Sequence, residues 1–202
     1  ARLQIFAAGF ATHAESDALK GGAKPSASLL AHVDAVDKVL ASDSTALATA
    51  DALQILDEDF FRVVKSRTNA ASWLARFSKV MDVVAAQPNV AEADQLGAVG
   101  SKLQAIKTIN GAIPAGVARA ATARVNAALA EQQIPYVRSG IINAVLPIFD
   151  LLGQNEQAYK VVQGELKNTA TPYYYKTDLG ELAEQLGRKN EALKWYSEGF
   201  AE

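Results

Sequence analysis

The sequence contains no cysteine among its 202 residues. This absence excludes disulfides, thiolate metal ligands and cysteine nucleophiles within these residues, although it does not decide the compartment. Aromatic residues make up only 7% of the chain, and runs of β-branched residues with period 2, the usual sign of strands, are also absent. Alanine, which has the best intrinsic helix propensity, is abundant. Together these features predict an all-α fold.

An excess of positive charge is lacking as well. The formal net charge is −2 and the isoelectric point is about 5.8, without the basic stripe that is typical of nucleic-acid-binding proteins. The longest apolar run, Gly140 to Leu152, includes Asn143, Pro147 and Asp150 and is too short to span a bilayer. We therefore predict neither a nucleic-acid partner nor a transmembrane segment.

Histidine is scarce, with His13 and His32 the only two. A metal site needs three or four converging ligands, and neither histidine belongs to such a spacing. The acidic run Asp57-Glu58-Asp59 does not define a site either, because consecutive helical residues point about 100° apart. We interpret this run as a solvated helix face, and we expect no metal and no cofactor.

Two other patterns are weak signals of chemistry. The segment Gly97-Ala98-Val99-Gly100-Ser101-Lys102 has the ingredients of a phosphate-binding loop in the wrong order. A helix that is loosened by its two glycines, or packed closely through them, is the preferred interpretation. No nucleophile-elbow or other catalytic signature surrounds any serine. The sequence therefore predicts no enzyme activity within these residues.

Apolar residues at three-to-four spacing predict a succession of amphipathic helices. The first is expected over Arg2–Leu19, with Leu3, Phe6, Phe10 and Ala14 on one face. A long third helix is expected from about residue 45 to 66, after a capping cluster at residues 42–44. The remaining helices are expected at 28–41, 69–87, 95–109, 114–131, 136–152 (kinked or divided by Pro147), 155–166, 172–186 and 189–201.

The C-terminal third of the chain repeats itself. The segment Leu152–Lys160 is similar in sequence to Leu186–Lys194. Leu, Gly, Ala and Lys each recur in the second segment after a step of 34 (186 − 152 = 34). A period of this size with helical patterning is the sign of a stacked helix-turn-helix repeat. Within residues 1–134 no such period occurs, and residues 111–114 are the most favoured internal boundary there.

The end of the chain, residues 173–202, resembles a tetratricopeptide repeat. Such repeats place a Leu-Gly pair in the first helix, a glycine at the turn, an alanine early in the second helix and an aromatic residue four positions later. Here Leu179-Gly180, Gly187, Ala192 and Tyr196 match these positions. Gly180 and Ala192 would let the two helices approach closely, and Gly187 can adopt the left-handed cap conformation.

The preceding unit is more degenerate. Gly153 and Ala158 are in place, but Val145-Leu146 stands where Leu-Gly would be, and Pro147 lies inside the first helix. The resemblance covers about a third of the chain. It implies a right-handed α-α superhelix over residues 135–202, behind a helical region of unassigned type over 1–134, unless the two form one continuous helical domain.

Three consecutive tyrosines at the start of an expected helix cannot all be buried on one face. Exposed tyrosine supplies rigid contact area and a hydroxyl group, which suits peptide recognition. The alternative is that two of them pack between repeats and one is simply exposed. We predict a surface for a protein or peptide partner, lined by Tyr173, Tyr174, Tyr175, Lys176, Arg138 and Asn143.

These features lead to one main hypothesis and two alternatives. The main one is a non-catalytic helical-repeat scaffold or protein-protein interaction module. Because the chain begins with Ala1 and ends in a crowded apolar helix, we expect it to be part of a longer protein, in either the cytoplasm or the periplasm. One alternative is a helical regulatory or substrate-presenting domain of a larger enzyme, such as a bacterial thioredoxin-like protein. The other is a small-molecule or lipid pocket among the first six helices.

Overall fold

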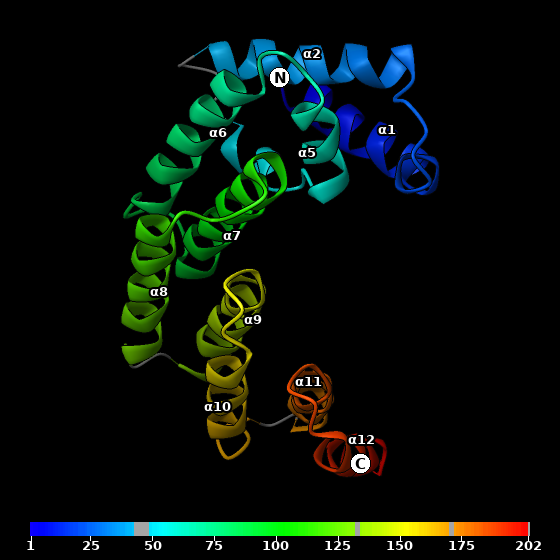
Figure 1. The fold of residues 1–202 in the computed structure, drawn as a ribbon. Helices are drawn as coiled ribbons and strands as arrows, with labels where there is room; N and C mark the ends of the chain where they lie inside the picture. The colour runs from blue at the N-terminus through cyan, green and yellow to red at the C-terminus, as the bar shows by residue number, and fades with distance from the viewer. Residues whose placement is uncertain (43–48, 132–133, 170–171, 202) are drawn as a thin grey trace. The chain divides into compact units, whose positions relative to one another are not determined.

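The chain is helical throughout the part that the structure describes (Figure 1). The computed structural model describes residues 1–42, 49–131, 134–169 and 172–201, and it contains no β-strand in these ranges. This confirms the all-α prediction. The helices are α1 (Arg2–Lys20), α2 (Ala27–Ala41), α4 (Ala50–Leu53), α5 (Glu58–Lys65), α6 (Ala70–Ala85), α7 (Glu92–Asn110), α8 (Ala115–Ala130), α9 (Pro135–Leu151), α10 (Asn155–Glu165), α11 (Pro172–Gln185) and α12 (Lys189–Phe200).

The helices belong to two compact units, Ala1–Ala118 and Arg119–Glu202. The division lies within α8, upstream of the boundary at 134/135 that the sequence pattern marks. Among the described residues, no helix has the length and apolar character needed to cross a bilayer.

Four aromatic side chains form the centre of the first unit. Phe60 and Phe61 come from α5, Trp73 and Phe77 come from α6, and all four are buried. Trp73 stacks on Phe77 with ring centroids 5.0 Å apart and planes 15° apart, while Phe61 meets Phe77 edge-on at 5.5 Å. Such pairs contribute about 0.5–1.5 kcal/mol each beyond the burial of their area. The aromatic cluster therefore joins α5 to α6.

The prediction of one long helix over residues 45–66 is wrong. Its described part is interrupted between Leu53, where α4 ends, and Glu58, where α5 begins. The carboxylate of Asp57 accepts a hydrogen bond from the backbone N–H of Phe60 at 3.0 Å, which makes Asp57 the N-cap of α5. Residues 45–48 of that expected helix, and residues 43–44 of the capping cluster, lie outside the described residues.

The interpretation of the acidic run as a solvated face holds for Asp57 and Glu58, which are exposed, and is wrong for Asp59. Asp57 caps α5, and Glu58 pairs on the surface with Arg62. Asp59 is buried, and it accepts a hydrogen bond from the Ser16 hydroxyl of α1 at 2.5 Å. A buried carboxylate requires such partners to offset its lost hydration. Asp57 therefore caps the start of α5, and Asp59 binds α1 to α5.

The first helix presents a different face to the core from the one expected. Leu3, Phe6 and Phe10 are exposed, and so is Ala14. The buried face of α1 consists instead of Ile5, Ala8, Thr12 and Ser16. The bond of Ser16 to Asp59 of α5 holds this face against the core. Thr12 can be buried on it because the Thr12 hydroxyl donates to the carbonyl of Ala8 within the helix at 2.8 Å.

The segment with phosphate-loop ingredients is regular helix. It lies inside α7, which packs against α6 and α5. A Cβ atom at Gly97 would lie 2.6 Å from the side-chain oxygen of Gln54, so the absence of a side chain permits a close contact. Lys102 forms an ion pair with Asp82 of α6 at 2.6 Å. Both features hold helices together.

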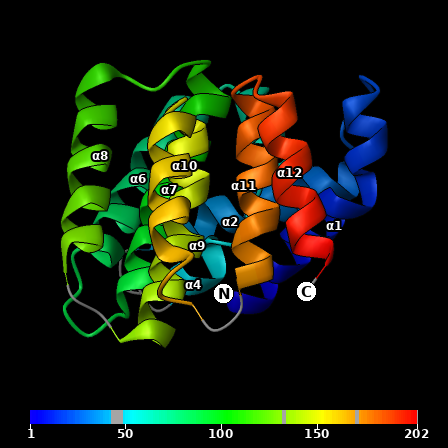
Figure 2. The same cartoon turned by 90° about the horizontal axis from the view of Figure 1, so that it is seen from below.

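In the second unit the helix ends agree with the predicted ones to within one residue. Figure 2 shows α11 and α12 side by side, and α11 packs against α10 as well. Pro147 does not divide α9, which continues to Leu151. Proline removes the donor to the carbonyl of Asn143, but both residues lie on the exposed face, where water can hydrogen-bond to that carbonyl.

We expect Trp73→Phe to lower the free energy of unfolding by less than about 1.5 kcal/mol, and Trp73→Ala to lower it by about 3–5 kcal/mol. The indole Nε1 is buried without a hydrogen-bond partner in the described part of the chain, so phenylalanine loses no hydrogen bond. Alanine instead leaves a cavity beside Phe77. Urea unfolding followed by circular dichroism measures both values, and equal losses would contradict the packing role of the ring.

Candidate protein-interaction surface

Two glycines related by the step of 34 (187 − 153 = 34) end the first helix of each C-terminal helix pair in the same way. Gly153 follows α9 with φ +68°, and Gly187 follows α11 with φ +74°. The N–H of each glycine donates to the carbonyl three positions earlier, at 3.0 and 2.9 Å. The N–H of the next residue donates to the carbonyl five positions earlier, at 2.8 Å in both turns. These bonds and the left-handed glycine form a Schellman motif at both places.

Gly180, within α11, sets the distance between α11 and α12. Gly180 lies against the ring of Tyr196, and a Cβ atom at position 180 would lie 2.3 Å from the Cε1 atom of that ring. Gly199 approaches the start of α11, where a Cβ atom would lie 3.5 Å from the carbonyl oxygen of Tyr173. The Tyr196 hydroxyl donates to Glu184 at 3.1 Å, and burial together with this bond raises the pKa of Tyr196. The two helices are therefore packed closely along their length.

The side chain of Tyr159 connects α10 to α12. Its hydroxyl donates to Glu191 at 2.5 Å and accepts from the indole N–H of Trp195 at 2.8 Å. The guanidinium of Arg188 lies over its ring, 5.3 Å from the centroid. Burial, and then the bond to Glu191, raise the pKa of Tyr159. All of its polar capacity is used inside the unit, which makes its role structural.

Two polar contacts between alternate helices are also related by the step of 34. Thr122 of α8 and Gln154, at the start of α10, exchange a hydrogen bond at 3.0 Å. Glu156 of α10 and Arg188, at the start of α12, form an ion pair at 2.5 Å. Adding 34 to the first pair of numbers gives the second pair. Thus α8 contacts α10 at the positions through which α10 contacts α12.

The three consecutive tyrosines are divided between interior and surface. Tyr175 is 6% exposed, whereas Tyr173 and Tyr174 are 38% and 61% exposed. The rings of Tyr173 and Tyr174 lie with centroids 4.0 Å apart. A hydrogen bond with Tyr174 raises the pKa of Tyr173. Two of the three tyrosines thus form an accessible aromatic pair at the start of α11, while the third packs inward.

Of the other predicted surface residues, Lys176 lies on the same helix as this pair, whereas Arg138 and Asn143 lie on α9. Arg138 of α9 donates two hydrogen bonds to the buried carboxylate of Glu165, at 2.7 and 2.9 Å, and a third to the carbonyl of Leu129 at 2.6 Å. Its guanidinium is therefore used within the unit. Asn143 is exposed further along α9, and Lys176 is half-buried on α11 next to the tyrosines.

An acidic stripe continues the aromatic pair along α11. Tyr174, Thr177, Glu181 and Glu184 recur at helical spacing and are all exposed. Beside them Asp178 is half-buried, and burial followed by the negative charge of Glu181 raises its pKa. These acids were not among the predicted surface residues, which were chosen around the aromatic run. Their recurrence at every third or fourth position after Tyr174 was the available signal.

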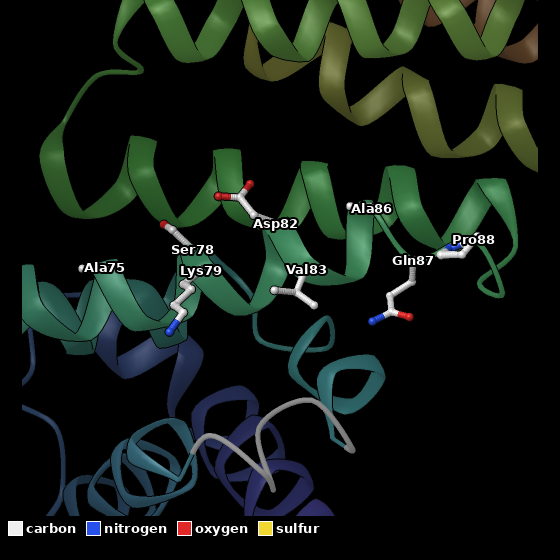
Figure 3. Close-up of a pocket in the computed structure, with 8 residues that line it drawn as sticks. All are labelled: Ala75, Ser78, Lys79, Asp82, Val83, Ala86, Gln87 and Pro88. Atoms are coloured by element: carbon white, nitrogen blue, oxygen red, sulfur yellow. The ribbon is translucent and has the colours of Figure 1, made fainter.

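The described residues of the first unit line hollows at two places that bear on function. One, of about 600 Å³, lies along α6, and Figure 3 shows that all of its labelled side chains come from that helix and the residues that follow it. Its carboxylate, Asp82, is neutralised by Lys102. The other, of about 720 Å³, lies between the starts of α1 and α7, α4 and the end of α6, and it contains the ion pair of Arg2 with Asp51. Neither contains a converging catalytic set.

No group of three or more histidine, cysteine, aspartate or glutamate residues that could hold a metal ion occurs in the described ranges. His13 is exposed and His32 is half-buried. Comparison with protein-family models, with curated proteins and with solved structures gave no significant match. The class that the structure defines is an all-α protein with a C-terminal unit of paired helices.

We expect Gly180→Ala to lower the free energy of unfolding by about 1–3 kcal/mol, because the new methyl group would collide with the Tyr196 ring. In a Tyr196→Ala background the same substitution should cost nothing, since the obstacle is gone. Gly164→Ala in α10 is the matched control: its Cβ would meet nothing within 4 Å, and it should stabilise by about 0.5–1 kcal/mol. Chemical denaturation of the four variants tests this, and a loss at Gly180 that persists without the ring would contradict the packing.

Asp178 should reduce stability at neutral pH. Because its pKa is raised on folding, the folded state binds the proton more tightly, and stability falls as pH rises above the ordinary aspartate value of about 3.9. Asp178→Asn should therefore stabilise the protein at pH 7, and this gain should shrink as the pH falls and vanish below about 3.9. The gain should shrink in a Glu181→Gln background. Thermal unfolding across pH measures it, and a gain that grows on acidification would reverse the sign.

Proposed function

We propose that the protein is a non-catalytic interaction module, and that its second unit is a tetratricopeptide-like stack of helix pairs that binds a protein or peptide. The equivalent turns at Gly153 and Gly187 support the repeat, as does the close contact of Gly180 with Tyr196. Helix pairs with a fixed step stack against their neighbours and form extended surfaces suited to binding.

One observation carries this proposal. Three exposed residues of α9 have exposed counterparts on α11, because Asn143, Pro147 and Asp150 become Thr177, Glu181 and Glu184 when 34 is added. All six are exposed. Positions that are exposed in both of two successive helix pairs support a surface that continues from pair to pair, as a partner-binding face requires.

The side chains on this face define the chemistry of the partner. Tyr173 and Tyr174 provide a rigid aromatic pair with accessible hydroxyls, which is the residue type enriched at interfaces. Glu181, Glu184 and Asp150 make the rest of the face acidic. A partner segment that contains lysine or arginine together with an apolar or aromatic side chain complements both parts. In this arrangement Arg138 supports the surface from within by holding α9 to α10.

We expect a peptide library screened against the purified chain to yield basic ligands whose affinity falls at least about tenfold in Tyr174→Ala, equivalent to about 1.4 kcal/mol. Glu181→Gln should weaken binding less, and its effect should diminish at high salt because it acts through charge. Fluorescence anisotropy with labelled peptides measures both.

Phe10→Ala is the matched control, since Phe10 is an exposed aromatic residue on α1 of the other unit. Its affinity should equal that of the unaltered protein. Circular dichroism must show that Tyr174→Ala remains folded. Peptides that bind equally to the Tyr174→Ala protein would remove this face from the proposal.

A further inference from the structure

The larger hollow of the first unit is lined by polar side chains from several separate segments. Its volume of about 720 Å³ lies within the range of about 300–1,000 Å³ that is usual for small-molecule sites. Its walls come from the starts of α1 and α7, from α4 and the residue that follows it, and from the end of α6 with the connection to α7. The polar side chains that line it are Arg2, Asp51, Gln54, Gln87, Asn89 and Asp94.

Contacts within the protein hold these walls in place. The amide nitrogen of Gln95 donates to the carbonyls of Gln87 and Val90, at 2.9 and 2.8 Å, and these bonds fix the connection between α6 and α7. The amide oxygen of Gln54 lies against Gly97 of α7, where a Cβ atom would come within 2.6 Å of it. A site whose walls are already ordered loses less conformational entropy when a ligand binds.

The charges in this hollow leave one carboxylate uncompensated. The guanidinium of Arg2 donates to both carboxylate oxygens of Asp51, at 2.9 and 3.1 Å, so these two charges offset each other. Asp94 forms no ion pair with any residue that the structure describes. The lining therefore carries a single net negative charge, which favours a ligand with one positive charge and disfavours phosphates and carboxylates.

Three amide side chains supply hydrogen-bonding groups that the protein does not use itself. The amides of Gln54, Gln87 and Asn89 make no hydrogen bond within the described ranges. Each amide has donors and an acceptor, and a hydroxyl group, which also donates and accepts, complements it. None of the described residues that line the hollow is aromatic, so a flat aromatic ligand would find no ring on which to stack.

We propose that this hollow binds a small amine that carries several hydroxyl groups, the chemical class to which amino sugars belong. The ammonium group of the ligand pairs with Asp94, and its hydroxyls exchange hydrogen bonds with the three amides. Val84 and Val90 line the hollow beside its carbon skeleton. The site lies in the first unit and is independent of the proposed peptide-binding face on α9 and α11, so either can fail without the other.

Titration of the isotope-labelled full chain, followed by NMR, tests the site with three probes. Glucosamine carries an ammonium group and hydroxyls, N-acetylglucosamine keeps the hydroxyls without the charge, and cyclohexylamine keeps the charge without the hydroxyls. We expect glucosamine to bind with a Kd on the order of 1 mM and to shift the side-chain N–H signals of Gln54, Gln87 and Asn89. The other two probes should bind at least about tenfold more weakly.

Glucosamine that shifts none of these signals overturns the proposal. Equal affinity for N-acetylglucosamine would contradict the pairing of an ammonium group with Asp94. Equal affinity for cyclohexylamine would contradict the recognition of hydroxyls by the amides.

Asp94→Asn removes the charge while nearly keeping the shape of the side chain. The affinity for glucosamine should fall about tenfold, and the affinity for N-acetylglucosamine should not change. Asp17→Asn is the matched control, because Asp17 is an exposed carboxylate on α1, about 22 Å along that helix from Arg2. This control should bind glucosamine like the unaltered protein. Equal losses in the two variants would reflect general attraction of a cation to acidic side chains and would overturn the site.

Gly97→Ala tests how Gln54 is positioned. The new methyl group would lie 2.6 Å from the Gln54 amide oxygen, so that flexible side chain must move, while alanine keeps α7 helical. We expect the affinity for glucosamine to fall severalfold and the side-chain signals of Gln54 to shift in the free protein, with the helical circular dichroism unchanged. Gly164→Ala, in the other unit, should leave both unchanged. An unaltered affinity in Gly97→Ala would overturn the part assigned to Gln54.

Discussion

The missing Cβ atom at Gly180 is the constraint on which the second unit depends. The Tyr196 ring occupies the space where that atom would be, so α12 reaches its position against α11 only because residue 180 has no side chain. With α12 held there, Trp195 and Glu191 reach the hydroxyl of Tyr159 on α10. The contact between successive helix pairs therefore follows from one close approach within a pair.

Buried polar groups decide which residues remain available to a partner. Glu165 is buried and engages Arg138, and Tyr159 engages residues of α12, so these side chains serve the interior. Burying such groups without partners would cost more than any contact they could offer a ligand. What remains accessible on α11 is the pair Tyr173 and Tyr174 with the acids that follow it, and this residue set motivates the proposed interaction surface.

The sequence predicted those parts of the fold that depend on neighbouring residues. The helix ends of the second unit could be located because Gly153, Gly187 and Pro172 act on their own turns. The division of the three tyrosines between surface and interior followed from helical geometry, since consecutive residues cannot share a face. In contrast, the start of α5 was missed, because the apolar stripe continues through Leu56 although Asp57 caps a new helix there.

The sequence by itself determined the all-α class, the step of 34 and the positions of the turns, because propensity, capping and periodicity act over a few residues. Only the tertiary structure decided which face of α1 is buried, since Ser16 and Asp59, whose bond orients that helix, are 43 residues apart. It also decided that Arg138 faces inward and that Leu193 faces outward although Tyr159, one step earlier, is covered. These outcomes depend on contacts between distant segments, which no local pattern records.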